Sequence, residues 1–176
     1  MASKPYTALL NYCMRALTRR AHTEFEMRQK LQKYIKKYLN KPDSISAQDF
    51  DQDLVDNSTK ELEDAVIARL KDLKFIDDTA LIESAIHSSA EHRLEGKIKL
   101  AARLRKKGIS FSETSLAWKE SDLSEREIAI KALLHAQKRF ARLPREKLFQ
   151  RKAQFLASRG FSPEIIFELA RKDEIA

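Results

Sequence analysis

Apolar residues recur along this chain every three to four positions, with charged and polar residues between them. Leu10, Met14 and Leu17 form one such stripe, and a second one includes Met27 and Leu31. This spacing places the apolar side chains on one face of an α-helix. The pattern predicts helices over residues 6–20, 23–38, 61–74, 79–92, 94–107, 112–120 and 124–142, then from Pro144 to Gly160 and from Ser162 onward.

Few residues in this chain favour tight turns. The 176 residues include only 3 Gly and 4 Pro, so long helices joined by polar links are expected. One segment, at about residues 40–60, interrupts the helical pattern with Pro42, several Ser and five Asp. We predict a polar acidic loop there, which either stays solvated or meets a basic protein surface.

An internal repeat divides the chain. Residues 104–110 (LRKKGIS) match residues 156–162 (LASRGFS). In both, a Gly suits a left-handed helix end, a large apolar residue follows it, and a Ser can open the next helix. The match predicts an all-α protein of three tandem three-helix repeats, over residues 6–76 (with the acidic insert), 77–120 and 121–176, although helix-end signals can also coincide by chance.

Charge is the strongest compositional feature. Charged residues make up 34% of the chain, the formal net charge is +8 and the pI is about 9.6. So high a charged fraction favours an elongated, curved arrangement of the repeats over a compact globule. The positive balance favours an anionic partner: nucleic acid, an acidic protein surface or a protein–DNA filament.

Basic residues gather at helical spacing. Lys30, Lys33 and Lys37 share one face, and the second repeat has a corresponding face with Lys99, Arg103 and Lys106. Such faces suit phosphate contacts without sequence readout, or they are simply solvated. The complete candidate set for binding is Arg19, Arg20, Arg28, Lys30, Lys33, Lys37, Lys99, Arg103, Lys106, Lys107, Lys147 and Arg151.

Other chemistry finds little support in the sequence. Cys13 lies in an apolar stripe and fits a core position, and Asp77-Asp78 fits a helix N-cap better than an acid catalyst. The four His show no metal-ligand spacing, and Phe111 and Trp118 have helical phases that fit a core. We therefore expect no enzyme, metal or cofactor. With no apolar run or secretory signal, we expect a cytoplasmic protein without membrane contact.

Three strings resemble the RecX family, bacterial proteins that regulate the RecA recombinase. The first is residues 17–31, which include a Thr23-x-x-Glu26 capping box, and the third is the repeat pair described above. The second is residues 70–78, close to the family's Leu-x-x-Leu-Gly-(Tyr/Phe)-(Ile/Leu)-(Asp/Asn)-Asp signature. In the first string the matching residues are Arg20, Thr23, Glu26, Lys30 and Leu31.

The resemblance implies a three-repeat, helical, monomeric regulator without catalysis of its own. Such a protein binds RecA, lies along the groove of its DNA filament, and restrains ATP hydrolysis and strand exchange in DNA repair, homologous recombination and the SOS response. Weak, non-specific contact with single- and double-stranded DNA is expected of the basic faces.

Two departures from the family concern geometry. Lys74 stands where the family has Gly, so a different turn is expected there, and the insert at about 40–60 exceeds the family's short link. The competing hypothesis is a helical DNA-binding transcription or nucleoid-associated factor. Its recognition helices would need polar readout residues, and the basic faces carry few Asn or Gln.

Overall fold

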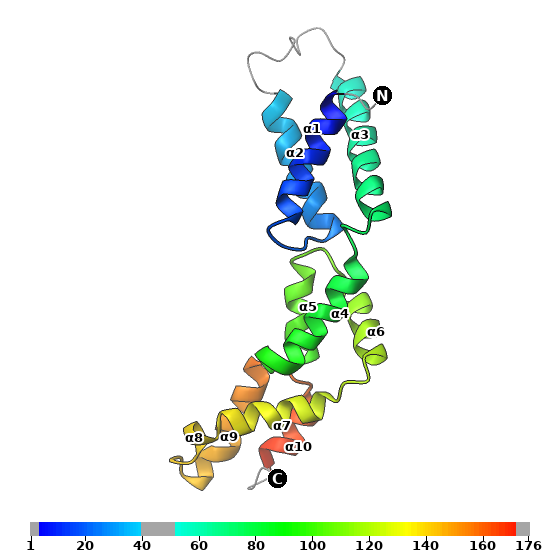
Figure 1. Ribbon diagram of the computed structural model, residues 1–176. Helices are drawn as coiled ribbons and strands as arrows, with labels where there is room; N and C mark the ends of the chain where they lie inside the picture. The colour runs from blue at the N-terminus through cyan, green and yellow to red at the C-terminus, as the bar shows by residue number, and fades with distance from the viewer. Residues whose placement is uncertain (1–3, 40–51, 172–176) are drawn as a thin grey trace. The chain divides into compact units, whose positions relative to one another are not determined.

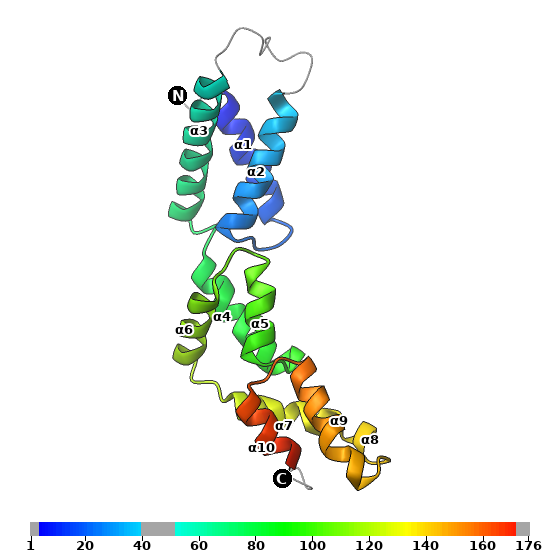
Figure 2. The ribbon, with the colours of Figure 1, turned by 180° about the vertical axis from the view of Figure 1, so that it is seen from behind.

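The computed structural model describes residues 4–39 and 52–171, and every regular element in these ranges is helical (Figures 1 and 2). The all-α prediction is confirmed. The elements are α1 (Lys4–Leu17), α2 (Glu24–Leu39), α3 (Gln52–Asp72), α4 (Asp78–Ser88), the π-helix η1 (Ser89–Arg93), α5 (Lys97–Arg105), α6 (Phe111–Glu120), α7 (Glu125–His135), α8 (Gln137–Phe140), α9 (Arg145–Ser158) and α10 (Pro163–Arg171).

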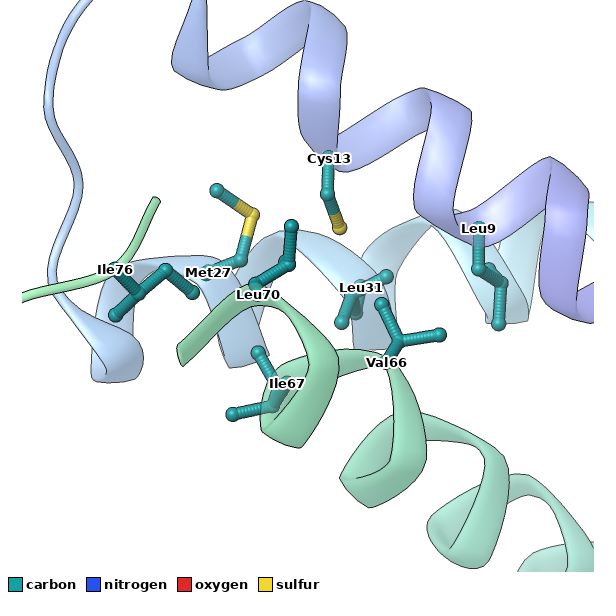
Figure 3. Packing of buried hydrophobic residues seen from close by; sticks show 8 residues of the cluster. All are labelled: Leu9, Cys13, Met27, Leu31, Val66, Ile67, Leu70 and Ile76. Atoms are coloured by element: carbon teal, nitrogen blue, oxygen red, sulfur yellow. The ribbon is translucent and has the colours of Figure 1, made fainter. Parts of the chain in front are cut away.

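The chain forms two compact units, divided between Leu81 and Ile82. In the first unit α1, α2 and α3 pack against one another, as both ribbon views show (Figures 1 and 2). Apolar side chains from all three helices meet in one core (Figure 3). Its buried members are Leu9, Cys13, Met27, Leu31, Val66, Ile67, Leu70 and Ile76.

The core of the first unit corrects part of the predicted pattern. On α1 the fully buried positions are Leu9 and Cys13, while the predicted stripe of Leu10, Met14 and Leu17 is only partly buried beside them. Leu73 lies inside the helix predicted over residues 61–74, but α3 ends at Asp72 and Leu73 is 43% exposed. Periodicity alone does not locate the end of a helix to the residue.

The predicted acidic loop is wrong in its second half. Helix α3 begins at Gln52, so residues 52–60 are helical; residues 40–51 lie outside the described ranges. The stretch from Gln52 to Lys60 contains no Gly or Pro. Acidic residues near a helix N-terminus also interact favourably with its dipole, so the Asp-rich composition that indicated a loop is compatible with a helix start.

In the second unit α5 contacts α6, α7 contacts α9 and α10, and α9 packs along α10. Its helix boundaries differ from the predicted ones at two places. Leu94 adopts a left-handed conformation (φ 49°) that closes η1, so α5 begins at Lys97. The predicted helix over 124–142 is broken at Ala136, and α8 then packs against α9, where Phe140 meets Phe155 edge-on at 5.6 Å. Tertiary contact here outweighs helical continuity.

Exposure also corrects the aromatic assignments. Trp118 is buried as predicted, whereas Phe111 is 56% exposed at the first position of α6. The preceding residue, Ser110, is the N-cap of α6, because Ser110 and Glu113 form a reciprocal capping box. The first turn of α6 therefore leaves Phe111 facing solvent.

The matched strings 104–110 and 156–162 adopt the same turn. Gly108 and Gly160 are left-handed, with φ of 85° and 73°. The next N–H in each turn donates to the carbonyl of the matching leucine, Ile109 to Leu104 at 3.2 Å and Phe161 to Leu156 at 3.3 Å. These are the helix-ending bonds that the C-cap prediction requires. The division into three repeats stays a prediction.

Candidate nucleic-acid interface

The link from α1 to α2 is held by the capping box that the sequence predicts. The Glu26 N–H donates to Thr23 Oγ1 at 3.1 Å, and the Thr23 N–H donates to Glu26 Oε2 at 3.3 Å. The Arg20 guanidinium donates to both carboxylate oxygens of Glu26, at 3.0 and 3.2 Å. Arg20 therefore fastens the link to the start of α2, and its charge is neutralised within the chain.

Arg28 ties α2 to α3. Its guanidinium donates to Glu24 at 2.8 Å, to Glu63 at 3.3 Å and to Asp64 at 2.6 Å. Lys71 also reaches Glu24, at 2.8 Å. Hydrogen bonds from Lys71 and Arg28 lower the pKa of Glu24 below its ordinary value. Arg28 thus serves as an internal fastening, and three carboxylates compete with any phosphate for it.

The predicted basic face of α5 is partly turned inward. Arg103 donates to the buried Glu95 carboxylate and to Ser89 Oγ at 2.9 Å, and its own side chain is 30% exposed. Lys99 Nζ donates to the Ser158 carbonyl at 2.9 Å, which joins α5 to the end of α9. Two of the three cations of this face, Lys99 and Arg103, therefore already bond within this unit, and the role of the face in binding stays a prediction.

The remaining candidates differ in how well solvent reaches them. Lys30 is half-buried, and Lys107 is half-buried and takes part in contacts within the chain. Besides Arg20 and Lys99, which bond within the chain, the exposed members of the set are Arg19, Lys33, Lys37, Lys106, Lys147 and Arg151. These six side chains are sterically available to an anionic partner, and their role in binding stays a prediction.

The first unit also has a cleft that the sequence pattern does not predict. Its volume is about 600 Å³, and it lies where the last turns of α1, the following link and the middle of α2 meet. Tyr12 and Tyr34 stack in its wall, with ring centroids 4.4 Å apart and an interplanar angle of 25°. The lining residues are Tyr12, Arg15, Ala16, Arg19, Arg20, His22, Lys30 and Tyr34.

Two of these lining residues are also fixed by local bonds. His22 is buried and its Nδ1–H donates to the Arg20 carbonyl at 2.8 Å, while burial lowers the pKa of its imidazole. Arg15 Nε donates to the Asn11 carbonyl at 3.3 Å. Tyr12 is followed by Arg15 at i+3, and Lys30 by Tyr34 at i+4. Those intervals place an aromatic and a cation on the same helix face, and this was the available signal.

No other chemical site competes with these surfaces in the described ranges. Burial raises the pKa of the Cys13 thiol to about 12, which fits its position in the core. Among residues 4–39 and 52–171, no three His, Cys, Asp or Glu side chains gather in a metal-binding group. No helix in these ranges is both long and apolar enough to cross a bilayer.

Family comparisons agree at both ends of the chain. The model for the first three-helix domain of RecX matches residues 10–34, and the model for the third three-helix domain matches residues 125–169. A protein of Chlorobaculum tepidum named Regulatory protein RecX is 28% identical over 167 residues, which cover 94% of this chain and 88% of that relative. One of the same name from Mycolicibacterium smegmatis is 29% identical and covers 90% of this chain and 76% of its own length.

The chain is similar to RecX proteins over about nine-tenths of its length. Solved structures of RecX proteins have the same helical fold. The crystal structure of RecX from Lactobacillus salivarius covers 93% of this chain and 97% of its own, with a TM-score of 0.68 and 19% identity. A second one, a crystal structure of regulatory protein RecX, covers 96% of this chain and 73% of its own, with a TM-score of 0.68 and 22% identity.

The RecX models span different parts of the two units. The first match covers most of α1 and the first two-thirds of α2, including the capping box and the cleft. The other match runs from the start of α7 into α10 and includes the turn at Gly160. The chain therefore has a regulatory family's fold along its length, and the RecX family is not a known enzyme family.

Proposed function

We propose that this chain regulates a bacterial RecA recombinase by binding RecA and its DNA filament, and that it restrains ATP hydrolysis and strand exchange. The observation that carries the proposal is the family match at both ends of the chain, with curated relatives named regulatory protein aligned over nine-tenths of it. The regulator acts in homologous recombination and DNA repair, including the SOS response, in the cytoplasm. It acts without catalysis of its own.

The exposed cations are the proposed filament contacts. Lys33, Lys106 and Arg151 are exposed members of the basic set on α2, after α5 and on α9. The proposal leaves out Arg20, Arg28 and Arg103, since carboxylates of the chain already bind them. A filament carries DNA phosphates and protein carboxylates, and exposed lysine and arginine side chains attract both.

The test is RecA activity on single-stranded DNA. Added below stoichiometry, the purified chain should lower the steady-state ATP hydrolysis and strand exchange of RecA, because one bound molecule contacts several protomers or blocks filament growth. An unchanged ATPase together with no retention of RecA on the immobilised chain would overturn the proposal. In that case a helical DNA-binding factor would become the leading account.

A charge-reversal variant tests the surface. We expect Lys33→Glu combined with Lys106→Glu and Arg151→Glu to weaken inhibition. The matched control is Lys60→Glu with Lys119→Glu and Lys138→Glu, which changes net charge equally at exposed cations outside the candidate set. Equal inhibition by the two triple variants would refute the assignment of contacts while leaving RecA regulation intact. Circular dichroism checks that both remain folded.

A further inference from the structure

We propose that the cleft between α1 and α2 in the first unit binds a short stretch of single-stranded DNA, with phosphates on its cations and a base on its tyrosines. The inference deepens the DNA-contact part of the proposed function. It assigns that contact to a cleft that shares Lys30 with the basic face of α2 and adds Arg15 and two tyrosines to it, and it predicts a preference for single strands over duplex.

The cleft offers charge that the chain does not neutralise. Arg15, Arg19 and Lys30 line it, from α1, the link and α2. Among the ion pairs that the structure describes in residues 4–39 and 52–171, none involves these three side chains. Arg20 is the exception in the lining, since Glu26 holds it. Three cations around one concavity attract an anion with several charged oxygens more strongly than separate surface lysines do.

The aromatic wall selects among anions. Tyr12 and Tyr34 are half-buried, pack against the first unit's core and stack on each other, so their rings are held in place before a ligand arrives. A base can extend this stack from the cleft side. Base–aromatic stacking beside a cationic backbone track is the usual way to bind single strands without sequence readout. A duplex offers phosphates, but its bases are already stacked on one another.

The size of the cleft is compatible with such a ligand. Its volume of about 600 Å³ lies inside the range of about 300–1,000 Å³ that ligand clefts have. The lining side chains come from elements already joined by the Thr23–Glu26 capping box and by the Arg20–Glu26 pair. Binding therefore requires little ordering of the link, which reduces the cost of association.

The experiment measures binding without RecA, so its result is independent of filament regulation. The full chain is titrated against a fluorescein-labelled oligothymidylate and against a duplex of equal phosphate number, with anisotropy as the readout. We expect tighter binding to the single strand. Arg19→Glu with Lys30→Glu should weaken binding roughly tenfold or more. Lys36→Glu with Lys60→Glu, an equal charge change on α2 and α3 outside the cleft, should change it only slightly.

A stacking variant separates base from phosphate recognition. Tyr12→Leu keeps an apolar side chain at the core edge, and it should weaken binding of the oligothymidylate roughly fivefold or more while leaving duplex binding nearly unchanged. Competition with inorganic phosphate and with thymidine monophosphate distinguishes a bare anion site from one that also holds a base. Only the nucleotide should displace the oligomer at low millimolar concentration.

Several results would overturn the inference. They are equal loss in the cleft and control double variants, duplex binding at least as tight as single-strand binding, or displacement by phosphate as effective as by the nucleotide. If a variant fails to fold, amide chemical shifts of the parent at Arg19 and Tyr34 decide the matter, since they should move on addition of oligothymidylate. A parent that binds the single strand in this cleft but leaves RecA unaffected would refute the proposed function alone.

Discussion

Lys74 holds a backbone conformation that lysine rarely adopts. Its φ is 55°, and the Phe75 N–H that follows donates to the Leu70 carbonyl at 2.9 Å. The sequence predicts a different turn here because Lys74 stands where RecX proteins have Gly. That difference does not arise, because the lysine takes the left-handed conformation that a glycine supplies without strain. The turn from α3 toward α4 is thus kept at a local energetic cost.

Replacing this lysine with glycine should stabilise the protein. A side chain in the left-handed region costs about 1–2 kcal/mol, and the greater freedom of glycine in the unfolded chain offsets part of that gain. We expect Lys74→Gly to raise the free energy of unfolding by up to about 1 kcal/mol. Lys60→Gly, within helix α3, should instead lower it by a similar amount. Urea denaturation of both variants checks the opposite signs, and a loss at position 74 would contradict the strain argument.

Arg103 contributes to stability through a carboxylate that has little contact with water. The Glu95 side chain is 6% exposed, and Arg103 is its ion-pair partner. Arg103→Met leaves that charge buried without a cation, so we expect a loss of roughly 2–3 kcal/mol, somewhat below the loss for a fully buried pair. Arg105→Met, at an exposed position of the same helix, should change the free energy of unfolding by less than about 0.5 kcal/mol.

Thermal or urea unfolding measures this difference, and Glu95→Gln combined with Arg103→Met should recover part of the loss. Equal stabilities of the two single variants would show that Glu95 is solvated.

The contact between Arg103 and Glu95 also limits which charge-reversal variants can test filament binding. Reversing the charge of Lys99, Arg103 and Lys106 together would place two carboxylates side by side in this cluster, and a loss of inhibition would then report misfolding.

At the scale of elements, two glycines let the start of α5 contact the turn between α9 and α10. The Gly96 N–H donates to the Arg159 carbonyl at 2.9 Å, and the Ile98 N–H donates to the Gly160 carbonyl at 3.1 Å. A Cβ on Gly96 would lie 2.3 Å from the Gly160 carbonyl oxygen, and one on Gly160 would lie 2.4 Å from the Lys99 nitrogen. Both neighbours are backbone atoms, which cannot rotate away.

Three glycine-to-alanine variants separate strain from collision. Gly108→Ala meets only the left-handed backbone, so it should cost about 1 kcal/mol. Gly96→Ala and Gly160→Ala must also push two backbone segments apart, and we expect losses of roughly 2–4 kcal/mol. Denaturant midpoints compare the three. If Gly160→Ala costs no more than Gly108→Ala, the close approach is not a constraint on folding.

The Glu24 network links two helices and predicts a pH dependence. Its partners lower the pKa of Glu24 in the folded state relative to an unfolded value near 4.5. The stabilisation is therefore present above that value and is lost as the pH falls through the lower folded pKa. Glu24→Gln should show a shallower loss of stability between about pH 5 and pH 3 than the parent. Glu61→Gln, on an exposed face of α3, serves as the control and should follow the parent.

Sequence reasoning located the helices better than the contacts between them. Local signals at Thr23–Glu26, Asp77, Gly108 and Gly160 depend on adjacent residues, and the structure contains each of these caps. The break at Ala136 depends on contact with α9, which no local pattern reveals. Likewise, the basic face of α5 is a correct helical projection, but the partner of Arg103 comes from the preceding segment. The tyrosine cleft was missed for the same reason.

At the scale of the whole molecule, net charge and usable charge differ. The formal charge is +8, yet several arginines of the predicted set are held by the chain's own carboxylates. A uniformly basic surface would lose DNA affinity in proportion to the net charge removed. A localised site would instead lose affinity only when its own cations are changed. The salt dependence of binding distinguishes the two, since it counts the phosphate contacts that are made.

For single strands each contact contributes about −0.7 to the slope of log affinity against log salt. Arg19→Glu with Lys30→Glu removes two cleft cations, so the slope should become shallower by about 1.4. Lys36→Glu with Lys60→Glu takes the net charge from +8 to +4 just as the cleft variant does, since each reversal removes two positive charges. Its slope should nevertheless stay that of the parent. Anisotropy titrations over a series of salt concentrations give both slopes. Slopes that fall equally in the two variants would mean that net charge, rather than the cleft, governs how this chain binds DNA.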